Sequence, residues 1–134
     1  MKHFQKGVAD TSVFIAKEQQ RTVRSGAIPD EIVVSVITIA ELYAGVLIAG
    51  DVSSRSRRMT TLESLGSVEI LDINERIARI WGELRVKLSE VGNRVNVNDL
   101  WIASTCISKN LPVITQDSDF DQIRKVSSLE IIKI

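Results

Sequence analysis

The sequence predicts an α/β fold in which a mainly parallel central sheet is flanked by helices on both faces. Short runs of β-branched residues alternate along the chain with longer segments of helical periodicity. Strands that are connected through helices pair in parallel, because each crossover places a helix against a face of the sheet. No internal repeat, low-complexity tract or Pro-rich linker interrupts the 134 residues. Residues 1–134 are therefore expected to form one domain.

The first half of the chain begins with a very short apolar run that leads into Asp10. Further on, Thr38 is a favourable N-cap, and Thr38 with Glu41 has the Thr-x-x-Glu spacing of a capping box. Gly50 is expected to end that helix, and Asp51 is expected to open another. The expected strands here are 7–9 and 32–36, and the expected helices are 11–17, 39–49 and 51–65.

The second half contains the clearest helix, 74–91, whose apolar residues recur at steps of three and four and form one stripe. These residues are Ile77, Ile80, Trp81, Leu84, Leu88 and Val91. Asn98 is expected to cap a helix over 99–109, and Asn110 and Pro112 are expected to stop it. The remaining expected strands are 68–71, 113–115 and 130–134.

Acidic residues fall at positions that such a sheet brings to a single edge. Asp10 and Asp117 follow the carboxyl ends of buried strands, whereas Glu41 and Asp99 open helices that begin on that edge. Carboxylates that converge repel one another and stay ionised only beside a cation. Their oxygens suit Mg²⁺ or Mn²⁺, and the sequence has no His cluster and only one Cys to support zinc. A site of this kind is suited to phosphate chemistry.

Each acid also has a purely structural interpretation. Glu41 can be the second member of its capping box, Asp10 a helix cap, and Asp117 and Asp119 turn formers. Asp99 is harder to explain in this way, because the apolar residues after it indicate burial and a buried carboxylate needs a partner.

Aromatic and basic residues give weaker signals. Trp81 and Trp101 lie in apolar helical patterns, which favours the core over stacking on bases. Arg55, Arg57 and Arg58 fit either an RNA path or a solvated helix face. Seventeen basic residues balance seventeen acidic ones, so any attraction to nucleic acid must come from local patches.

Four segments of the chain together resemble the PIN-domain ribonucleases of the VapC-like toxin family. The segments are Val-Ala-Asp-Thr-Ser-Val-Phe-Ile at 8–15, Ala-Glu-Leu-Tyr-Ala-Gly-Val at 40–46, Asn-Asp-Leu-Trp-Ile-Ala at 98–103 and Pro-Val-Ile-Thr-Gln-Asp-Ser-Asp-Phe at 112–120. They occur in the family's order and spacing. The resemblance implies a compact PIN fold, an endoribonuclease that depends on Mg²⁺ or Mn²⁺ and leaves a 5′-phosphate and a 3′-hydroxyl, and the toxin half of a toxin–antitoxin pair.

The resemblance also implies roles for individual residues. Asp10 and Asp99 resemble the acids most directly bound to metal, and Glu41 resembles the acid that holds the metal or its water. Asp117 resembles the fourth acid, with Asp119 as the second choice because family members differ at this segment. The hydroxyl of Thr115 is expected to support the site.

Two other functions compete with RNA cleavage. A PIN-like module that binds RNA or protein without turnover is one, but such modules usually lose acids that this chain keeps. A phosphate-receiver domain also gathers Asp residues at strand ends. It needs a phospho-accepting Asp after a central strand and a Lys after a later one, and neither appears in that order.

The expected setting is the cytoplasm. The lone Cys106 fits a small core residue in a reducing compartment, and residues 1–7 lack the apolar stretch of a signal peptide. The apolar stretch 32–50 approaches the length of a membrane span, but Glu41 at its middle makes a span costly, so no membrane contact is expected.

Two protein partners are expected. The apolar helix residues around Leu42, Tyr43 and Leu47 more than fill one face, which together with the resemblance predicts a homodimer. The helices over 39–65 also offer a groove for an amphipathic helix of a small VapB-like antitoxin. We expect an Arg or Lys of that antitoxin to reach Asp10, Glu41 or Asp99 in place of the metal.

Overall fold

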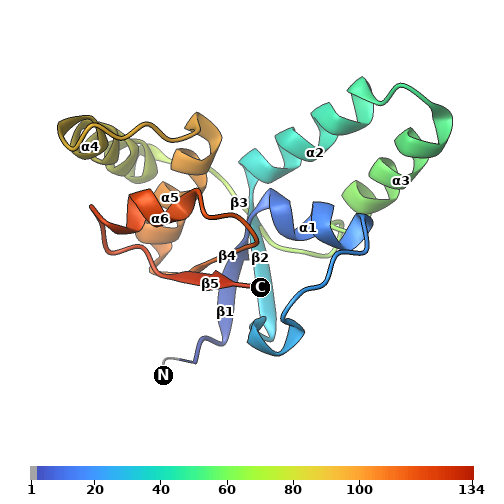
Figure 1. The fold of residues 1–134 in the computed structure, drawn as a ribbon, viewed down its shortest axis with the longest axis horizontal. Coiled ribbons are helices and arrows are strands. Elements are labelled where there is room, and N and C mark those ends of the chain that lie inside the picture. Colours follow the sequence, from blue (N-terminus) through green and yellow to red (C-terminus); the bar gives the residue numbers. More distant parts are fainter. Residues whose placement is uncertain (1–2) are drawn as a thin grey trace.

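A computed structural model describes residues 3–134, which form a five-stranded parallel sheet flanked by helices (Figure 1). The strand order is β3-β2-β1-β4-β5, and every neighbouring pair is parallel. The first strand of the chain therefore lies at the centre of the sheet. The predicted α/β class with a parallel sheet is confirmed.

The strands are β1 (Lys6–Ala9), β2 (Glu31–Ser35), β3 (Ile70–Leu71), β4 (Val113–Thr115) and β5 (Ile131–Lys133). The helices are α1 (Thr11–Glu18), the 3-10 helix η1 (Ser25–Ala27), α2 (Val36–Ile48), α3 (Val52–Glu63), α4 (Glu75–Glu90), α5 (Val97–Lys109) and α6 (Phe120–Arg124). The sequence predicted each of these elements except the short helices η1 and α6, which carry no periodic signal of their own.

Each strand residue packs on one face of the sheet or the other, as the pleat requires. Val8, Val33 and Val113 belong to the larger core cluster with residues of α4, α5 and α6. Their neighbours Ala9 and Val34 belong to the second cluster, which includes α1. Figure 1 shows α1, α2 and α3 on one side of the sheet and α4, α5 and α6 on the other.

Two helix starts differ from the prediction. The N-cap of α2 is Ser35, whose hydroxyl accepts from the amide of Ile37, so Thr38 lies inside the helix and the predicted capping box does not form. The N-cap of α5 is Asn96, whose side chain accepts from the amides of residues 98 and 99. The helix α2 therefore begins three residues before the position that Thr38 indicated, and α5 begins two residues before the position that Asn98 indicated.

The remaining core predictions have mixed outcomes. Cys106 is fully buried in the larger cluster, as expected. Trp81 packs on the same cluster and stacks on Trp101 with ring centroids 5.1 Å apart, which favours the structural interpretation of both. Val91 was assigned to the apolar stripe of α4 but is exposed after the helix ends.

Within residues 3–134, no helix combines the length and the apolar character that a membrane span needs. The stretch 32–50 instead divides into β2 and α2. The predicted lack of a signal peptide concerned residues 1–7, of which the first two lie outside the described residues.

Candidate metal centre

Asp10 follows β1 and is buried at the centre of the sheet edge. Its backbone amide donates to the carbonyl of Ile114, which keeps it in register beside β4. Ser12 Oγ donates to Asp10 Oδ1 at 2.6 Å, and Thr115 Oγ1 donates to Oδ2 at 2.9 Å. Burial raises the pKa of Asp10 to about 6, against the lowering effect of these two hydroxyls. Asp10 occupies the N-cap position of α1, as the capping interpretation predicts, but its side chain accepts from Ser12 and Thr115 and makes no cap hydrogen bond.

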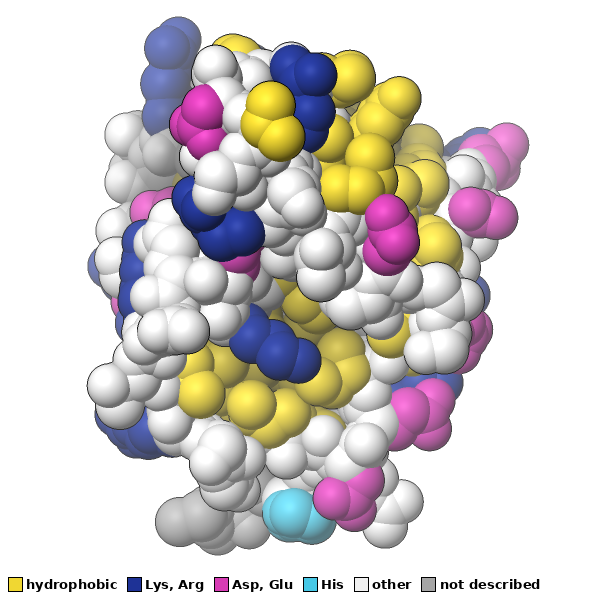
Figure 2. Space-filling view, turned by 90° about the vertical axis from the view of Figure 1, so that its right-hand side faces the viewer, with side chains coloured by type: hydrophobic (Ala, Val, Ile, Leu, Met, Phe, Trp, Pro, Cys, Tyr) yellow, Lys and Arg dark blue, Asp and Glu magenta, His cyan; other side chains and the backbone are white. Residues whose placement is uncertain are grey.

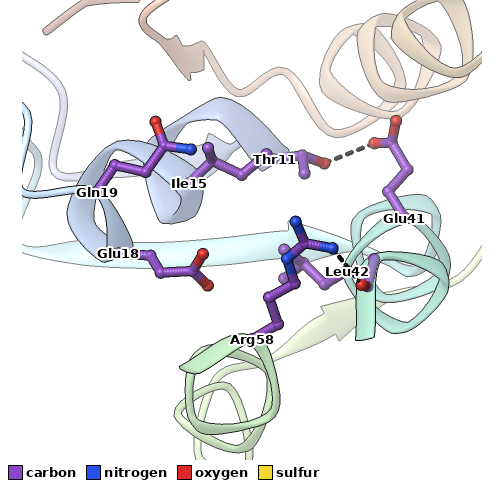
Figure 3. A pocket seen from close by; sticks show the side chains of 8 residues that line it. Thr11, Ile15, Glu18, Gln19, Glu41, Leu42 and Arg58 are labelled. Atoms are coloured by element: carbon purple, nitrogen blue, oxygen red, sulfur yellow. Dashed lines mark hydrogen bonds between the residues drawn. The ribbon is translucent and has the colours of Figure 1, made fainter. Parts of the chain in front are cut away.

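Glu41 lies on α2 and receives hydrogen bonds from two other helices. Thr11 Oγ1 of α1 donates to Glu41 Oε1 at 2.6 Å, as Figure 3 shows. Asn98 Nδ2 of α5 donates to Glu41 Oε2 at 3.3 Å. The carboxylate of Glu41 is therefore held between α1 and α5 and takes no part in a capping box.

Asp99 lies in the first turn of α5, partly buried between the other acids. Its burial, together with the negative charges of four neighbours, raises its pKa to about 7. In decreasing order of effect these neighbours are Asp10, Asp119, Glu41 and Asp117. All five predicted acids therefore lie near one another at the carboxyl edge of the sheet.

Asp117 and Asp119 come from the turn between β4 and α6. Asp117 is partly buried, and its amide donates to Thr115 Oγ1 at 3.0 Å. Burial and the charge of Asp119 raise the pKa of Asp117, whereas Arg21 lowers it. Asp119 is exposed, yet its charge acts on Asp99 more strongly than that of Asp117 does. Asp117 in turn acts on both Asp10 and Asp99.

The chemistry of this donor set fits a hard divalent cation. The converging atoms are carboxylate and hydroxyl oxygens, which Mg²⁺ and Mn²⁺ prefer over softer ligands. The ion pairs found within residues 3–134 join other groups, such as Lys6 with Glu31, so a cation is still needed to balance the acids. As the side chains stand, no three His, Cys, Asp or Glu residues of the described chain are placed to hold one ion.

A cavity of about 150 Å³ adjoins the Glu41 side of the acids (Figure 3). Residues of α1, α2 and α3 line it, including Thr11, Glu18 and Arg58. Arg58 Nη1 donates to the carbonyl of Gly45 at 2.6 Å, which holds its guanidinium over the cavity. The side chains of Arg55 and Arg57 bond within their own helix or to the turn before it, so only Arg58 of the three faces this cavity.

Sequence reasoning missed three residues that position the acids: Thr11, Ser12 and Asn98. Each one adjoins a predicted acid or lies two positions from it, and each lies within a segment that was recognised. Their hydroxyl and amide types were the available signal, since short polar side chains beside a buried carboxylate are its natural hydrogen-bond donors. The predicted support from Thr115 is confirmed.

Comparison with known proteins places these residues in a family. The PIN domain family matches residues 8–126. Ribonuclease VapC5 of Mycobacterium tuberculosis is 48% identical over 96% of this chain and 95% of its own length. Ribonuclease VapC4 of the same organism is 36% identical over 94% of this chain and 97% of its own.

Solved structures give the same grouping. The chain matches the crystal structure of VapBC-5, a member of the VapBC family of toxin-antitoxin systems from M. tuberculosis, with a TM-score of 0.91 and 45% identity. The match covers 98% of this chain and 100% of that one.

Proposed function

The chain belongs to the PIN-domain family, and from that premise we propose that it is a VapC-type endoribonuclease that depends on Mg²⁺ or Mn²⁺. Its relatives named Ribonuclease VapC5 and VapC4 align over nearly its whole length. The observation that carries the proposal is the convergence of five acids at one edge of the sheet, where the charges of four of them act on the fifth, Asp99.

Each acid has a role in this proposal. Asp10 and Asp99 would hold the metal directly, Glu41 would hold the metal or its water, and Asp117 would be the fourth acid, with Asp119 as the alternative. The bound cation would offset the charge of the scissile phosphate and lower the pKa of a bound water.

The residues around the acids keep them in place. Ser12 and Thr115 each donate to one oxygen of Asp10, which favours the ionised form of its carboxyl group and fixes its direction. Thr11 of α1 and Asn98 of α5 each donate to one oxygen of Glu41 and so fix the direction of its carboxylate. The proposed reaction is hydrolysis of an RNA phosphodiester that leaves a 5′-phosphate and a 3′-hydroxyl.

The test is cleavage of total RNA by the purified protein with Mg²⁺, by Asp10→Asn and Asp99→Asn variants, and by Asp72→Asn as a control on an exposed acid. We expect both site variants to lose cleavage while they stay folded by circular dichroism, and the control to remain active. Metal-dependent cleavage that survives in both site variants would refute the proposed centre.

We also propose a VapB-like antitoxin and a homodimer as partners, in the cytoplasm. The matched structure is of a toxin–antitoxin system member. In this chain, α2 and the start of α3 expose large apolar side chains: Tyr43, Leu47, Ile48 and Val52. These exposed side chains would form the homodimer contact, whereas an amphipathic antitoxin helix would lie over the cavity that α1, α2 and α3 line beside Glu41.

The antitoxin proposal is tested by looking for a gene for a small VapB-like protein beside this chain's gene and by co-purifying its product with this chain. We expect the complex to be inactive on RNA. Replacing the basic residues of that protein one at a time should identify an Arg or Lys whose loss restores cleavage, since such a cation pairs with the acids. Inhibition that survives every replacement would show a different means of silencing.

A further inference from the structure

A second cavity, of about 440 Å³, lies at the far end of α1 from Asp10. Apolar side chains that line it include Phe14 of α1, Ile28 after η1 and Ile32 of β2. Lys17 and Arg21, both exposed, supply its cationic side chains. Its volume falls in the range of sites that bind small organic groups, about 300 to 1,000 Å³.

We propose that this cavity binds an unpaired base of the RNA substrate, a few nucleotides from the phosphate that is cleaved. The inference rests on the proposed nuclease function and adds a second contact to it. Phe14 offers an aromatic surface to the base, while Lys17 and Arg21 face the phosphates on either side of it.

The shape of the surface agrees with such a ligand. In the face that Figure 2 turns to the viewer, the lower half is hollowed over an apolar floor, and a Lys or Arg side chain lies across it. A flat base with charged phosphates beside it matches an apolar floor between cations. A longer apolar peptide helix would find its continuous surface on α2 and α3 instead.

The cavity is connected to the acids through the backbone. Gln116 Nε2 donates to the carbonyl of Thr22 at 3.1 Å, which ties the segment after α1 to the turn after β4. Arg21, which lines the cavity, also lowers the pKa of Asp117. The eight residues of α1 separate Asp10 from this end. At about 1.5 Å per residue they span about 12 Å. Single-stranded RNA covers that distance in a few nucleotides.

The end of α1 is built to direct Arg21 towards the cavity. Gln20 has a left-handed backbone with φ of 57°. The amides of Gln20 and Arg21 donate back to the carbonyls of Lys17 and Ala16, which is the Schellman arrangement. The chain therefore turns at Gln20, and the next residues run over the cavity.

Anisotropy titration of fluorescein-labelled ten-nucleotide RNAs, in EDTA to prevent cleavage, measures this contact. We expect roughly ten-fold weaker binding by Phe14→Ala, because stacking contributes about 1 to 3 kcal/mol per base. Arg21→Gln should lower the slope of log K against log salt by about 0.7. Lys109→Gln, an exposed cation at the end of α5, is the matched control and should bind like the parent.

A single abasic nucleotide moved along the RNA then locates the base. We expect one position at which the parent loses affinity and Phe14→Ala does not, because both changes remove the same contact. If Phe14→Ala fails to fold, Ile28→Glu tests the same cavity. Ile28 lies in the loop before β2, so its substitution changes no residue of a helix or strand.

The outcomes separate this inference from the proposed function. A parent protein that cleaves RNA, with folded Phe14→Ala and Ile28→Glu variants that bind it equally well, overturns the base site alone. A parent that neither binds nor cleaves RNA overturns both. If these variants escape the antitoxin while they keep their RNA affinity, the cavity belongs to the antitoxin and the base site is wrong.

Discussion

Thr115 Oγ1 on β4 donates a hydrogen bond of 2.9 Å to Asp10 Oδ2 at the end of β1, although 105 positions separate the two residues. The bond holds down the pKa of a carboxylate that burial raises to about 6. The hydroxyl of Thr115 therefore favours the ionised form of Asp10, as that of Ser12 does.

Thr115→Val removes this donor while it keeps the branched shape of the side chain. We expect the pKa of Asp10 to rise, the acid limb of the pH profile of RNA cleavage to move upward, and metal affinity to fall roughly ten- to a hundred-fold. Thr115→Ser keeps the hydroxyl and should restore the profile. A profile that is the same in the Val variant and the parent would assign Thr115 to packing only.

Metal should stabilise the folded chain through the acid centre. We expect Mg²⁺ or Mn²⁺ to raise the melting temperature, since a ligand that binds only the folded state at a hundred times its Kd adds about 2.7 kcal/mol. Asp99→Asn should lose most of this rise, because Asp99 is the acid most affected by its neighbours. Equal shifts in variant and parent would place the ion elsewhere.

The stability of the metal-free protein should depend on pH with a definite sign. The folded pKa values of Asp10 and Asp99, about 6 and about 7, lie above their ordinary value of 3.8. Both groups bind more protons in the folded state, so stability is greatest below about pH 4 on this account and falls as pH rises to about 7.

The size of that loss is on the order of 2 to 3 kcal/mol for Asp10 and less for Asp99, which solvent partly screens. Urea unfolding in EDTA at several pH values measures it. Asp10→Asn should flatten the dependence and be more stable than the parent at pH 7.5. If the parent instead gains stability between pH 4 and 7, burial and repulsion do not raise the pKa values of Asp10 and Asp99 in the folded protein.

The apolar surface of α2 and α3 should form the homodimer contact. Leu47, Ile48 and Val52 are 61%, 81% and 86% exposed, which is unusual for large apolar side chains in one patch. Sedimentation at micromolar concentration should show a dimer, and Ile48→Lys should shift it to monomer. Val86→Lys, on the exposed face of α4, is the control and should remain dimeric. A parent that sediments only as monomer contradicts the prediction.

The order of strands and helices follows from periodicity, and so does the meeting of the acids. Both depend on patterns that extend over several residues, such as the stripe that includes Ile77 and Leu88. Helix starts depend on one residue. Ser35 and Thr38 are both favourable N-cap residues. Ser35 is the N-cap of α2 because β2 ends there with an extended backbone.

The supporting hydrogen bonds were out of reach of the sequence for a different reason. Ser12 and Asn98 gain their roles from contacts with Asp10 and with Glu41 that depend on exact side-chain directions. Asn98 was assigned to a cap because local rules allow that role, and Asn96 fills it instead. Because α5 begins two residues earlier than predicted, the side chain of Asn98 is available to donate to Glu41.

The central place of β1 in the sheet also sets the order in which the protein can assemble. Trp81 and Trp101 lie twenty positions apart and can meet early in folding, whereas Asp10 must wait for a strand made about a hundred residues later. On the ribosome, a growing chain that has not yet released β4 has no Thr115 beside Asp10 and no Asp117. Refolding from urea should therefore restore tryptophan fluorescence before it restores RNA cleavage. The acid centre is therefore incomplete until synthesis of the chain is nearly finished.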